Sequence, residues 1–358
     1  MFKARINKLM ELRSDVGVEA FYVTRPQNRF YLSGFTGTAG ALLLCGSGAF
    51  LLTDFRYLEQ AKQQSPHLTI VDATESLMNR LDELVRENNV SRLGYDGDHL
   101  SHNEFLRLKD KLVSVNLTAT SGLVEKLRLI KDSTEIKHIE EAVRLSDRAF
   151  EQVRPHIKPG VTEREIGLRL DFAMREMGAE GVAFETIVAS GPRSALPHGV
   201  ASSKRLQKGD LVIMDFGSVY CGYHSDITRT IVVGELAPWQ REIYSIVLEA
   251  QLKAIEAIRH GVKASAVDSA ARYVITSKGY GDYFGHGTGH GLGLDIHENP
   301  RLSRKVDTVL QAGMVVTVEP GIYLPGQGGV RIEDTVIVLE SGCRVLTQTP
   351  KMRLEILS

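Results

Sequence analysis

The spacing of apolar residues divides the first part of the chain into alternating helical and extended segments. Phe2, Ile6, Leu9 and Leu12 recur at helical intervals, which predicts a helix over residues 2–13. Further helices are expected over residues 76–88 and 102–112, and short strands over residues 20–23, 41–52 and 92–95. This alternation is typical of a mixed α/β domain, which we place at residues 1–125.

The pattern changes near residue 130, where a long amphipathic segment begins. Asp132 or Ser133 can cap a helix there, and Glu135 lies in the first turn, where the helix dipole favours an acid. Apolar residues then recur at helical spacing over residues 136–149. Residues 162–165 (TERE) have the form of a capping box and predict the next helix start. We therefore expect a second domain over residues 126–358.

The second domain contains two similar segments. Residues 208–217 (KGDLVIMDFG) resemble residues 312–321 (AGMVVTVEPG), 104 positions later, because each is an apolar run ending in an acid, a spacer and a glycine. Each is followed by a β-rich run with an acid near its start, SDITRTIVV at residues 225–233 and RIEDTVIV at residues 331–338. Any two strand–turn–strand units look somewhat alike, but matching acids inside apolar strands favour a duplicated half-domain with pseudo-twofold symmetry.

Four carboxylates occupy these strand contexts, and they are Asp215, Asp226, Glu319 and Glu333. A buried carboxylate without a partner costs several kcal/mol and takes up a proton instead. Arg229, Arg331 and Lys208 are too few to neutralise all four acids. Divalent metal ions supply positive charge compactly, so the acids predict a metal site.

Histidines in a glycine-rich segment add nitrogen ligands. Residues 283–300 (YFGHGTGHGLGLDIHENP) contain His286, His290 and His297, among glycines that disfavour a long helix. We therefore expect a loop and a short strand, and not a helical HExxH zinc site. His198, in the segment LPHG, is a fourth candidate. One histidine alone is more often structural, but four beside buried acids favour a role in the site, most strongly for His290.

Composition and charge argue against several other classes of protein. The chain has 43 basic and 44 acidic residues and a net charge of -1, which is poor support for binding to nucleic acid or a membrane surface. No apolar run approaches the roughly 18–20 residues of a membrane span, and the N-terminus is unlike a signal peptide. The three cysteines suggest neither disulfides nor a cysteine zinc site, so a cytoplasmic protein is expected. Cys221 lies between two of the acids, where a packing thiol is the preferred interpretation over a soft ligand.

Two glycine-rich segments are superficially similar to phosphate-binding loops. They are GFTGTAG at residues 34–40 and GHGTGHGLG at residues 285–293. Neither has the lysine of a P-loop, and the second lacks the strand-to-helix context of a dinucleotide fold. Nucleotide binding is therefore not expected.

The acids and the histidine together carry a resemblance to a known family. The sequence from about residue 125 to 358 resembles the pita-bread metallopeptidases, which include methionine aminopeptidase, prolidase and aminopeptidase P. The ordered ligand pattern of this family is filled by Asp215, Asp226, His290, Glu319 and Glu333, with gaps of 11, 64, 29 and 14 residues.

Four more residues match site positions of the same family. His198 and His297 match its two active-site histidines that are not ligands, and His286 and Arg331 match positions of the proline-specific branch. The resemblance implies that Arg331 orients a bridging carboxylate, the alternative being an arginine on the surface of a strand.

The resemblance also implies the fold class. It is α/β (α+β), with a C-terminal pita-bread domain of pseudo-twofold duplicated halves over residues 126–358 and a smaller mixed α/β N-terminal domain over residues 1–125. The segments at residues 34–40 and 53–61 (TDFRYLEQA) resemble the N-terminal domain of aminopeptidase P.

The chemistry implied by the resemblance uses two divalent metal ions per chain, with manganese, cobalt, zinc or iron open as the identity. Asp226 would hold one ion and His290 the other, Asp215 and Glu333 would bridge them, and Glu319 would complete the shell. A hydroxide between the ions would attack the scissile carbonyl. Glu319 would accept a proton from the attacking water.

The implied substrate is a peptide with proline at its second position. His198 and His297 would donate hydrogen bonds to the oxyanion and to the leaving proline. Phe184, Tyr223 and Tyr283 are candidates for the proline pocket, with a place in the core as the alternative. We expect an aminopeptidase P-like exopeptidase, because residues 34–61 resemble that enzyme. A prolidase restricted to dipeptides is the alternative, which the short chain favours.

Two more remote alternatives keep the fold with a different function. A non-catalytic peptide-binding relative or a creatinase-like amidinohydrolase would lack the metal ligands that this sequence retains. The family further implies a homodimer.

Overall fold

The computed structural model describes residues 1–357 and divides into two compact units, Met1–Arg128 and Leu129–Ser358. The expected domain boundary between residues 125 and 126 lies within helix α6 (Leu123–Arg128). Among the described residues, no helix has both the length and the apolar composition that a membrane crossing requires.

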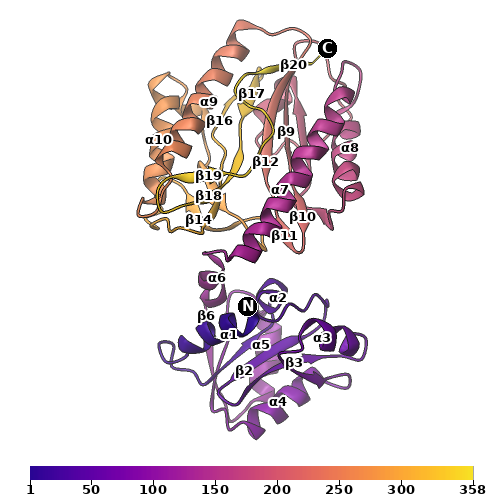
Figure 1. Ribbon diagram of the computed structural model, residues 1–358, viewed down its shortest axis with the longest axis vertical. Helices are drawn as coiled ribbons and strands as arrows, with labels where there is room; N and C mark the ends of the chain where they lie inside the picture. The colour runs from indigo at the N-terminus through magenta and orange to yellow at the C-terminus, as the bar shows by residue number, and fades with distance from the viewer. Residues whose placement is uncertain (358) are drawn as a thin grey trace. The chain divides into compact units, whose positions relative to one another are not determined.

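The first unit is built on one six-stranded mixed sheet in the order β4-β3-β2-β1-β5-β6 (Figure 1). Its strands are β1 (Ala20–Val23), β2 (Ala41–Cys45), β3 (Gly48–Thr53), β4 (Thr69–Asp72), β5 (Arg92–Asp96) and β6 (Asn116–Thr120). Its other helices are α1 (Phe2–Glu11), α2 (Pro26–Ser33), α3 (Leu58–Gln64), α4 (Leu77–Glu87) and α5 (His102–Lys111). The predicted helices and strands are confirmed within one or two residues at most ends, with the run at residues 41–52 divided into β2 and β3.

The second unit is a duplicated α/β structure in which each half pairs a curved sheet with two helices. The first sheet has the order β20-β12-β9-β8 and the second β14-β13-β15-β18-β19. The first-half elements are α7 (Ser133–Val153), α8 (Glu163–Glu176), β8 (Ile187–Ser190), β9 (Leu211–Phe216) and β12 (Ile227–Val233). The second-half elements are α9 (Pro238–Ala257), α10 (Ala264–Ser277), β13 (Gly289–Gly291), β14 (Glu298–Leu302), β15 (Val315–Val318) and β18 (Asp334–Val338).

Shorter elements complete this unit. Two hairpins join the main strands, β10 (Ser218–Tyr220) with β11 (Tyr223–His224), and β16 (Gly321–Leu324) with β17 (Gly328–Arg331). The remaining strands are β7 (Gly181–Val182), β19 (Cys343–Val345) and β20 (Glu355–Leu357), and the 3-10 turns are η1 (Arg154–His156), η2 (Gly191–Ala195) and η3 (Gly281–Tyr283).

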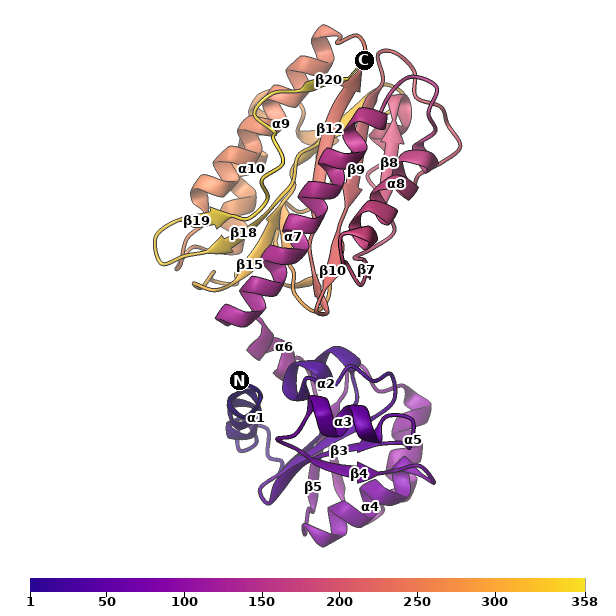
Figure 2. The same cartoon turned by 45° about the vertical axis from the view of Figure 1, so that its right-hand side comes forward.

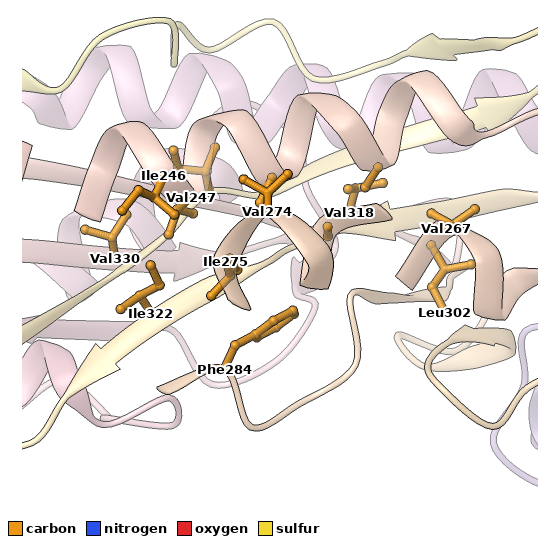
Figure 3. Packing of buried hydrophobic residues seen from close by; sticks show 14 of the residues in the cluster. Ile246, Val247, Val267, Val274, Ile275, Phe284, Leu302, Val318, Ile322 and Val330 are labelled. Atoms are coloured by element: carbon orange, nitrogen blue, oxygen red, sulfur yellow. The ribbon is translucent and has the colours of Figure 1, made fainter. Parts of the chain in front are cut away.

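Each half has its own helix layer and core. Helices α7 and α8 pack on the first sheet, and α9 and α10 lie side by side on the second (Figure 2). In the second core, apolar side chains of α9 and α10 such as Val247 and Ile275 pack with strand residues such as Val318 (Figure 3). Burial of these faces holds the strands that bear the acids in fixed positions.

The helix starts are explained by local capping. Asp132 accepts hydrogen bonds from the backbone N–H of Thr134 and Glu135, so Asp132, and not Ser133, caps α7. Thr162 and Glu165 form the predicted capping box of α8. These caps satisfy N–H groups that the first helical turn leaves without partners.

Candidate metal centre and cavity

The four acids lie at the ends of matching strands in the two halves. Asp215 is near the end of β9 and Asp226 directly precedes β12, which pairs antiparallel with β9. Glu319 directly follows β15, and Glu333 directly precedes β18, which pairs antiparallel with β15. In each half the connection between the two strands therefore returns the second acid to the level of the first, although the acids are 11 residues apart in the first half and 14 in the second.

His290 joins the acids from the short strand β13, which lies between β14 and β15. A Cβ atom at Gly289 would lie 2.0 Å from the carbonyl oxygen of Thr317, and one at Gly291 2.3 Å from that of Asn299. Only glycine permits so close an approach of the backbone. The ring Nδ1 donates to the carbonyl of Gly291 at 3.1 Å, and this contact turns Nε2 toward the acids.

Three of these residues form a compact group of ligand atoms. Asp226, His290 and Glu333 each offer one ligand atom, and these atoms lie within 4.8 Å of one another. His290 Nε2 is 3.4 Å from Asp226 Oδ2 and 3.5 Å from Glu319 Oε1. Asp215 lines the same cavity. The structure thus brings together all five residues that the sequence pattern singles out.

The electrostatics of the group call for cations. Burial raises the pKa of Asp226 and of Glu333 well above the ordinary values, and the neighbouring carboxylates raise both further. Burial also raises the pKa of Asp215, although Arg331 opposes this shift. Among the described residues, Asp215 Oδ1 and Glu333 Oε1 are buried without a hydrogen-bond partner. Buried carboxylate oxygens with free lone pairs, beside an imidazole nitrogen, fit divalent metal ions.

Arg331 connects this group to the surrounding side chains. Its Nη2 donates to Asp215 Oδ2 at 2.6 Å, and its Nη1 donates to the hydroxyl of Tyr323 at 2.9 Å and to the carbonyl of Pro197 at 3.1 Å. Its Nε donates to Thr228 Oγ1 at 3.0 Å, and Thr228 in turn donates to Glu333 Oε2 at 2.7 Å. Arg331 is only 3% exposed, so the alternative of a surface arginine is wrong.

His286 is the far end of this network. Its Nδ1 lies 2.8 Å from the carbonyl of Gly287 and therefore carries the proton, while Nε2 accepts from the Tyr323 hydroxyl at 2.9 Å. Burial lowers the pKa of His286, so the ring is neutral at pH 7. His286 thus acts on the acids through Tyr323 and Arg331.

A cavity of about 770 Å³ opens beside the group. Besides the acids and His290, its lining includes Phe184, Ile187, His198, His286, Ile296, His297, Arg301, Tyr323 and Arg331. His198 and His297 are exposed on its wall, and the ring of His297 is 4.3 Å from that of His290, centroid to centroid. Partial desolvation lowers the pKa of His297 to about 4, helped by His290 and Arg301, so this ring is neutral at pH 7.

Buried acids of the helices hold the two loops that carry these histidines. In the first half, Glu163 of α8 accepts hydrogen bonds from Ser190 and Ser202 and pairs with Arg193, on either side of His198. Such contacts fix loop backbone that would otherwise be free to move.

In the second half, Asp268 and Arg272 of α10 do the same for the glycine-rich loop. Asp268 accepts from the N–H and hydroxyl of Thr288, and Arg272 donates to the carbonyls of Phe284 and His286. The fold therefore uses equivalent helices to hold both loops.

Some sequence predictions about individual side chains are wrong. Tyr223 does not line the cavity, because its hydroxyl bonds Glu135 at 3.1 Å and its ring stacks on His138. Tyr283 is exposed and also outside the cavity lining, whereas Phe184 lines it. The interpretation that the basic residues are too few to neutralise the four acids agrees with the structure, because Arg229 pairs with Asp334 instead.

Cys221 is also outside the site. It lies at the turn between β10 and β11 with a positive φ of 47° and is a free, partly buried thiol. The preferred interpretation, a packing thiol in a loop, fits this place.

Sequence reasoning missed Tyr323, Thr228 and Arg301. Tyrosine and threonine are common in strands, so only the hydrogen-bond partners of Tyr323 and Thr228 show that they belong to the site. Arg301 had a weak signal, since it lies four residues after His297 in the same histidine-bearing segment.

Family models match nearly the whole chain. The model described as metallopeptidase family M24 matches residues 137–340, and the one described as the Creatinase/Prolidase N-terminal domain matches residues 5–130.

Individual relatives are similar over their full length. The chain is 43% identical to a Xaa-Pro dipeptidase of Pyrococcus furiosus, covering 98% of this chain and 99% of that protein. The solved structure of a Xaa-Pro dipeptidase from Bacillus anthracis superposes with a TM-score of 0.98 at 47% identity, with complete coverage of both chains. An X-Pro aminopeptidase from Thermotoga maritima superposes with a TM-score of 0.91 at 39% identity, covering 98% of this chain and 99% of that one.

Proposed function

The chain belongs to metallopeptidase family M24, and from this premise we propose that it is a Xaa-Pro dipeptidase, a metallo-exopeptidase that hydrolyses the bond before proline in dipeptides. The observation that carries the proposal is the cavity that joins the five-residue group to Arg301. A dipeptide has a free carboxylate directly after the proline, and Arg301 is an exposed cation on the cavity wall. Relatives at 43% and 47% identity carry the name Xaa-Pro dipeptidase, which supports the same substrate class.

In this proposal the five residues hold two divalent metal ions, with manganese, cobalt or zinc as candidates. Asp215, Asp226, His290, Glu319 and Glu333 would together hold the ions, because all five line the same cavity. The carboxylate oxygens without partners support this assignment, as does the Nε2 of His290, which lies 3.4 Å from Asp226 and 3.5 Å from Glu319. Bound ions of this kind supply Lewis acidity at the scissile carbonyl and make water a stronger nucleophile near neutral pH.

The protein groups around the ions would move protons and bind the substrate. Glu319 is half-buried at the cavity edge and would accept the proton of the attacking water. His198 and His297 would donate hydrogen bonds to the oxyanion and to the leaving proline. Phe184 and Ile187 would provide apolar surface for the proline ring.

An aminopeptidase P activity on longer peptides is the second candidate. It is favoured by the similarity to the Thermotoga maritima X-Pro aminopeptidase and by the resemblance of residues 34–61 to the N-terminal domain of aminopeptidase P. The two activities differ in the group that is attached to proline on its C-terminal side: a free carboxylate in a dipeptide, or a further peptide bond in a longer substrate. The part of the cavity around Arg301 must accommodate either that carboxylate or that peptide bond.

A substrate comparison tests the proposal. Hydrolysis of Xaa-Pro and Xaa-Pro-Yaa is measured at equal concentration with Mn²⁺, Co²⁺ and Zn²⁺ in turn, using wild type and Arg301→Met. The dipeptide should be preferred in wild type, and the variant should raise its KM at least about tenfold, as loss of a charge-assisted contact predicts. Arg304→Met, a nearby arginine outside the cavity lining, is the control. Equal or faster turnover of Xaa-Pro-Yaa would favour the second candidate, and no turnover of either would refute both.

Two further expectations complete the proposal. Residues 1–125 would form a creatinase/prolidase-type N-terminal domain, and the chain would form a homodimer. Light scattering on the purified chain measures the second directly, and a monomer at assay concentration would contradict it.

A further inference from the structure

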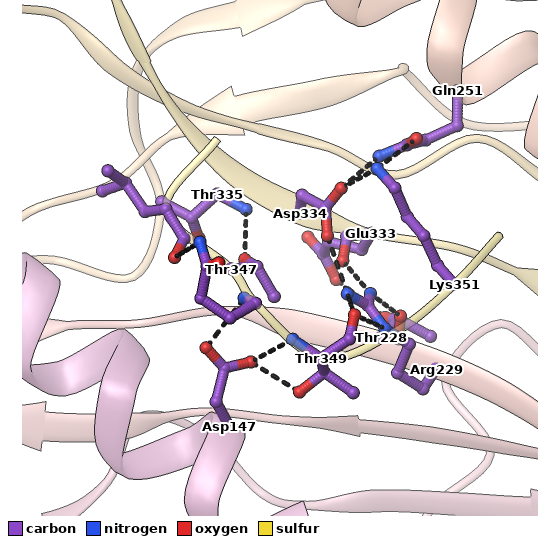
Figure 4. Close-up of polar contacts among 12 residues, drawn as sticks. Asp147, Thr228, Arg229, Gln251, Glu333, Asp334, Thr335, Thr347, Thr349 and Lys351 are labelled. Carbon is purple, nitrogen blue, oxygen red and sulfur yellow. Dashed lines mark hydrogen bonds and ion pairs between the residues drawn. The ribbon is translucent and has the colours of Figure 1, made fainter. Parts of the chain in front are cut away.

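A buried charged cluster lies behind the candidate metal ligands, on segments far apart in the chain. It consists of Arg229 on β12, Asp334 on β18, Gln251 on α9 and Lys351 in the C-terminal segment (Figure 4). Arg229 is 2% exposed, and Asp334 and Gln251 are fully buried. We call these four residues the Arg229 cluster. It shares no residue with the cavity lining or the ligand group.

All five N–H groups of the Arg229 guanidinium have acceptors. Nη1 donates to the carbonyls of Thr228 at 2.9 Å and Glu333 at 2.6 Å. Nη2 donates to Asp334 Oδ1 at 2.8 Å and to the carbonyl of Thr349 at 2.6 Å, and Nε donates to the same carbonyl at 3.2 Å. One side chain therefore joins β12, the start of β18 and the C-terminal segment.

Asp334 closes the cluster from the other side. Its Oδ1 accepts from Arg229, and its Oδ2 accepts from Gln251 Nε2 at 2.8 Å and pairs with Lys351. Lys351 Nζ also donates to Gln251 Oε1 at 2.8 Å. Because Asp334 directly follows Glu333, fixing its side chain fixes the backbone that carries the Glu333 carboxylate.

Arg229 Nη1 donates to the backbone carbonyls of Thr228 and Glu333, and these two residues also bond each other at the Glu333 carboxylate. Thr228 donates its hydroxyl to Glu333 Oε2 at 2.7 Å, and the N–H of Glu333 donates to the carbonyl of Thr228 at 3.1 Å. Arg229 thus holds both ends of the contact between Thr228 and Glu333. That contact is the place where the two halves of the unit meet at the ligand group.

A purely structural role does not account for the cluster well. Burying two cations and one acid carries a desolvation cost, and well-packed apolar residues often stabilise a core as much or more. Such a cluster gains its value from geometry, because a guanidinium with five fixed donors defines the positions of its acceptors within a few tenths of an ångström.

We propose that Arg229 and Asp334, supported by Lys351, are positioning residues that hold Glu333 in its metal-binding geometry and thereby set the metal affinity of the site. The inference rests on the proposed metal site. Loss of the guanidinium would leave the Glu333 backbone and the Thr228 contact without their common anchor. The free energy of metal binding would then include the cost of ordering Glu333.

The test measures metal binding itself. Calorimetric titration of the metal-free full chain with Mn²⁺ and Co²⁺ compares wild type with Arg229→Met, Arg229→Lys and Lys351→Met, each well below its own unfolding temperature. Arg229→Met should weaken affinity about 10–100-fold, the range for residues that orient metal ligands. Arg229→Lys should behave similarly, since an ammonium cannot bind all the acceptors. Lys351→Met should give a smaller loss, up to about tenfold.

The matched control is Arg154→Met. Arg154 also binds the C-terminal part of the chain, through Glu355, but contacts none of the candidate ligands. Its removal should lower the unfolding temperature of the metal-free chain without changing metal affinity.

The outcomes separate the inference from the proposed function. Wild-type affinity in both folded Arg229 variants and in Lys351→Met would overturn the inference alone. If the Arg229 variants do not fold, Lys351→Met decides, since Lys351 is only partly buried and unchanged affinity in this variant would have the same meaning. If wild type itself binds neither ion, the proposed function fails and the inference fails with it.

Discussion

The two hairpins of the second unit occupy equivalent places and have different tasks. In the first half, β10–β11 joins β9 to β12 and packs against α7, where Ser218 Oγ donates to the carbonyl of Ala142 at 2.8 Å. In the second half, β16–β17 joins β15 to β18 and carries Tyr323 and Arg331 into the cavity. The duplication supplies one pair of acids from each half, but only one hairpin supplies groups that contact them.

This difference shows how a symmetric fold can build an asymmetric site. Arg331 of the second half pairs with Asp215 of the first, so the longer hairpin acts on the acid of the opposite half. The shorter hairpin has no such reach, and one of its two tyrosines, Tyr223, donates to Glu135 of α7. Strand registers of the two main sheets are repeated by duplication, whereas the side chains of the connecting hairpins are free to differ because the hairpins lie outside those sheets.

Removing one acid from each half should give equal and large effects. Asp226→Asn and Glu333→Gln each take one anionic ligand from the group, so metal retention and Xaa-Pro hydrolysis should both fall, the rate by at least about 10³-fold. Metal content by mass spectrometry and turnover at saturating substrate measure the two losses. Glu235→Gln, at an exposed acid just after β12, should change neither. A full-activity variant of either acid would break the equivalence of the halves.

Removing the arginine that acts across the halves should have the next largest effect. Arg331→Met takes away the partner of Asp215 and the donor to Tyr323 and Thr228. We expect kcat to fall about 10–100-fold, as for other groups that orient ligands. Arg331→Lys should restore little, because one ammonium cannot reach these acceptors together. Wild-type kcat in both variants would show that the asymmetric hairpin has no part in the reaction.

Metal affinity should rise with pH, because ligands from both halves must lose protons. The pKa values of Asp226 and Glu333 are raised in the folded chain by burial, so below those values each ion competes with protons. Each proton displaced should tighten binding by up to about tenfold per pH unit until the folded pKa is passed. Metal titrations from about pH 5 to pH 8, where the chain is expected to stay folded, measure the slope of metal affinity against pH. A flat or falling profile would contradict the raised values.

The smallest expected effect compares one tyrosine from each hairpin, Tyr323 and Tyr223. Tyr323→Phe removes the hydroxyl that joins Arg331 to His286, and should lower kcat/KM about fivefold, the equivalent of one hydrogen bond of about 1 kcal/mol. Tyr223→Phe removes a buried hydroxyl from the other hairpin. It should lower the unfolding free energy by about 1 kcal/mol and leave kcat/KM unchanged. Equal kinetic effects in the two variants would remove the distinction between the hairpins.

Local sequence patterns were sufficient to predict many of the helices and strands. The capping boxes at Asp132 and Thr162 and the apolar spacing of α1, α4, α5 and α7 act within one or two helical turns, so they can be read without the structure. Helix α2 and strand β6 were missed, because Pro26–Ser33 and Asn116–Thr120 have weak patterns and are fixed by packing on the sheet.

The sequence by itself identified the residues of the candidate ligand group. The acids and His290 could be found from it because strand ends, hairpins and their spacing are local features that a duplication repeats. Only the tertiary structure decided how those residues are oriented. Thr228 and Glu333 are 105 positions apart, as are Arg229 and Asp334, and contacts between such distant segments leave no periodic signal in the chain. They exist because two separately folded halves pack together, and that packing fixes side-chain geometry which no local pattern encodes.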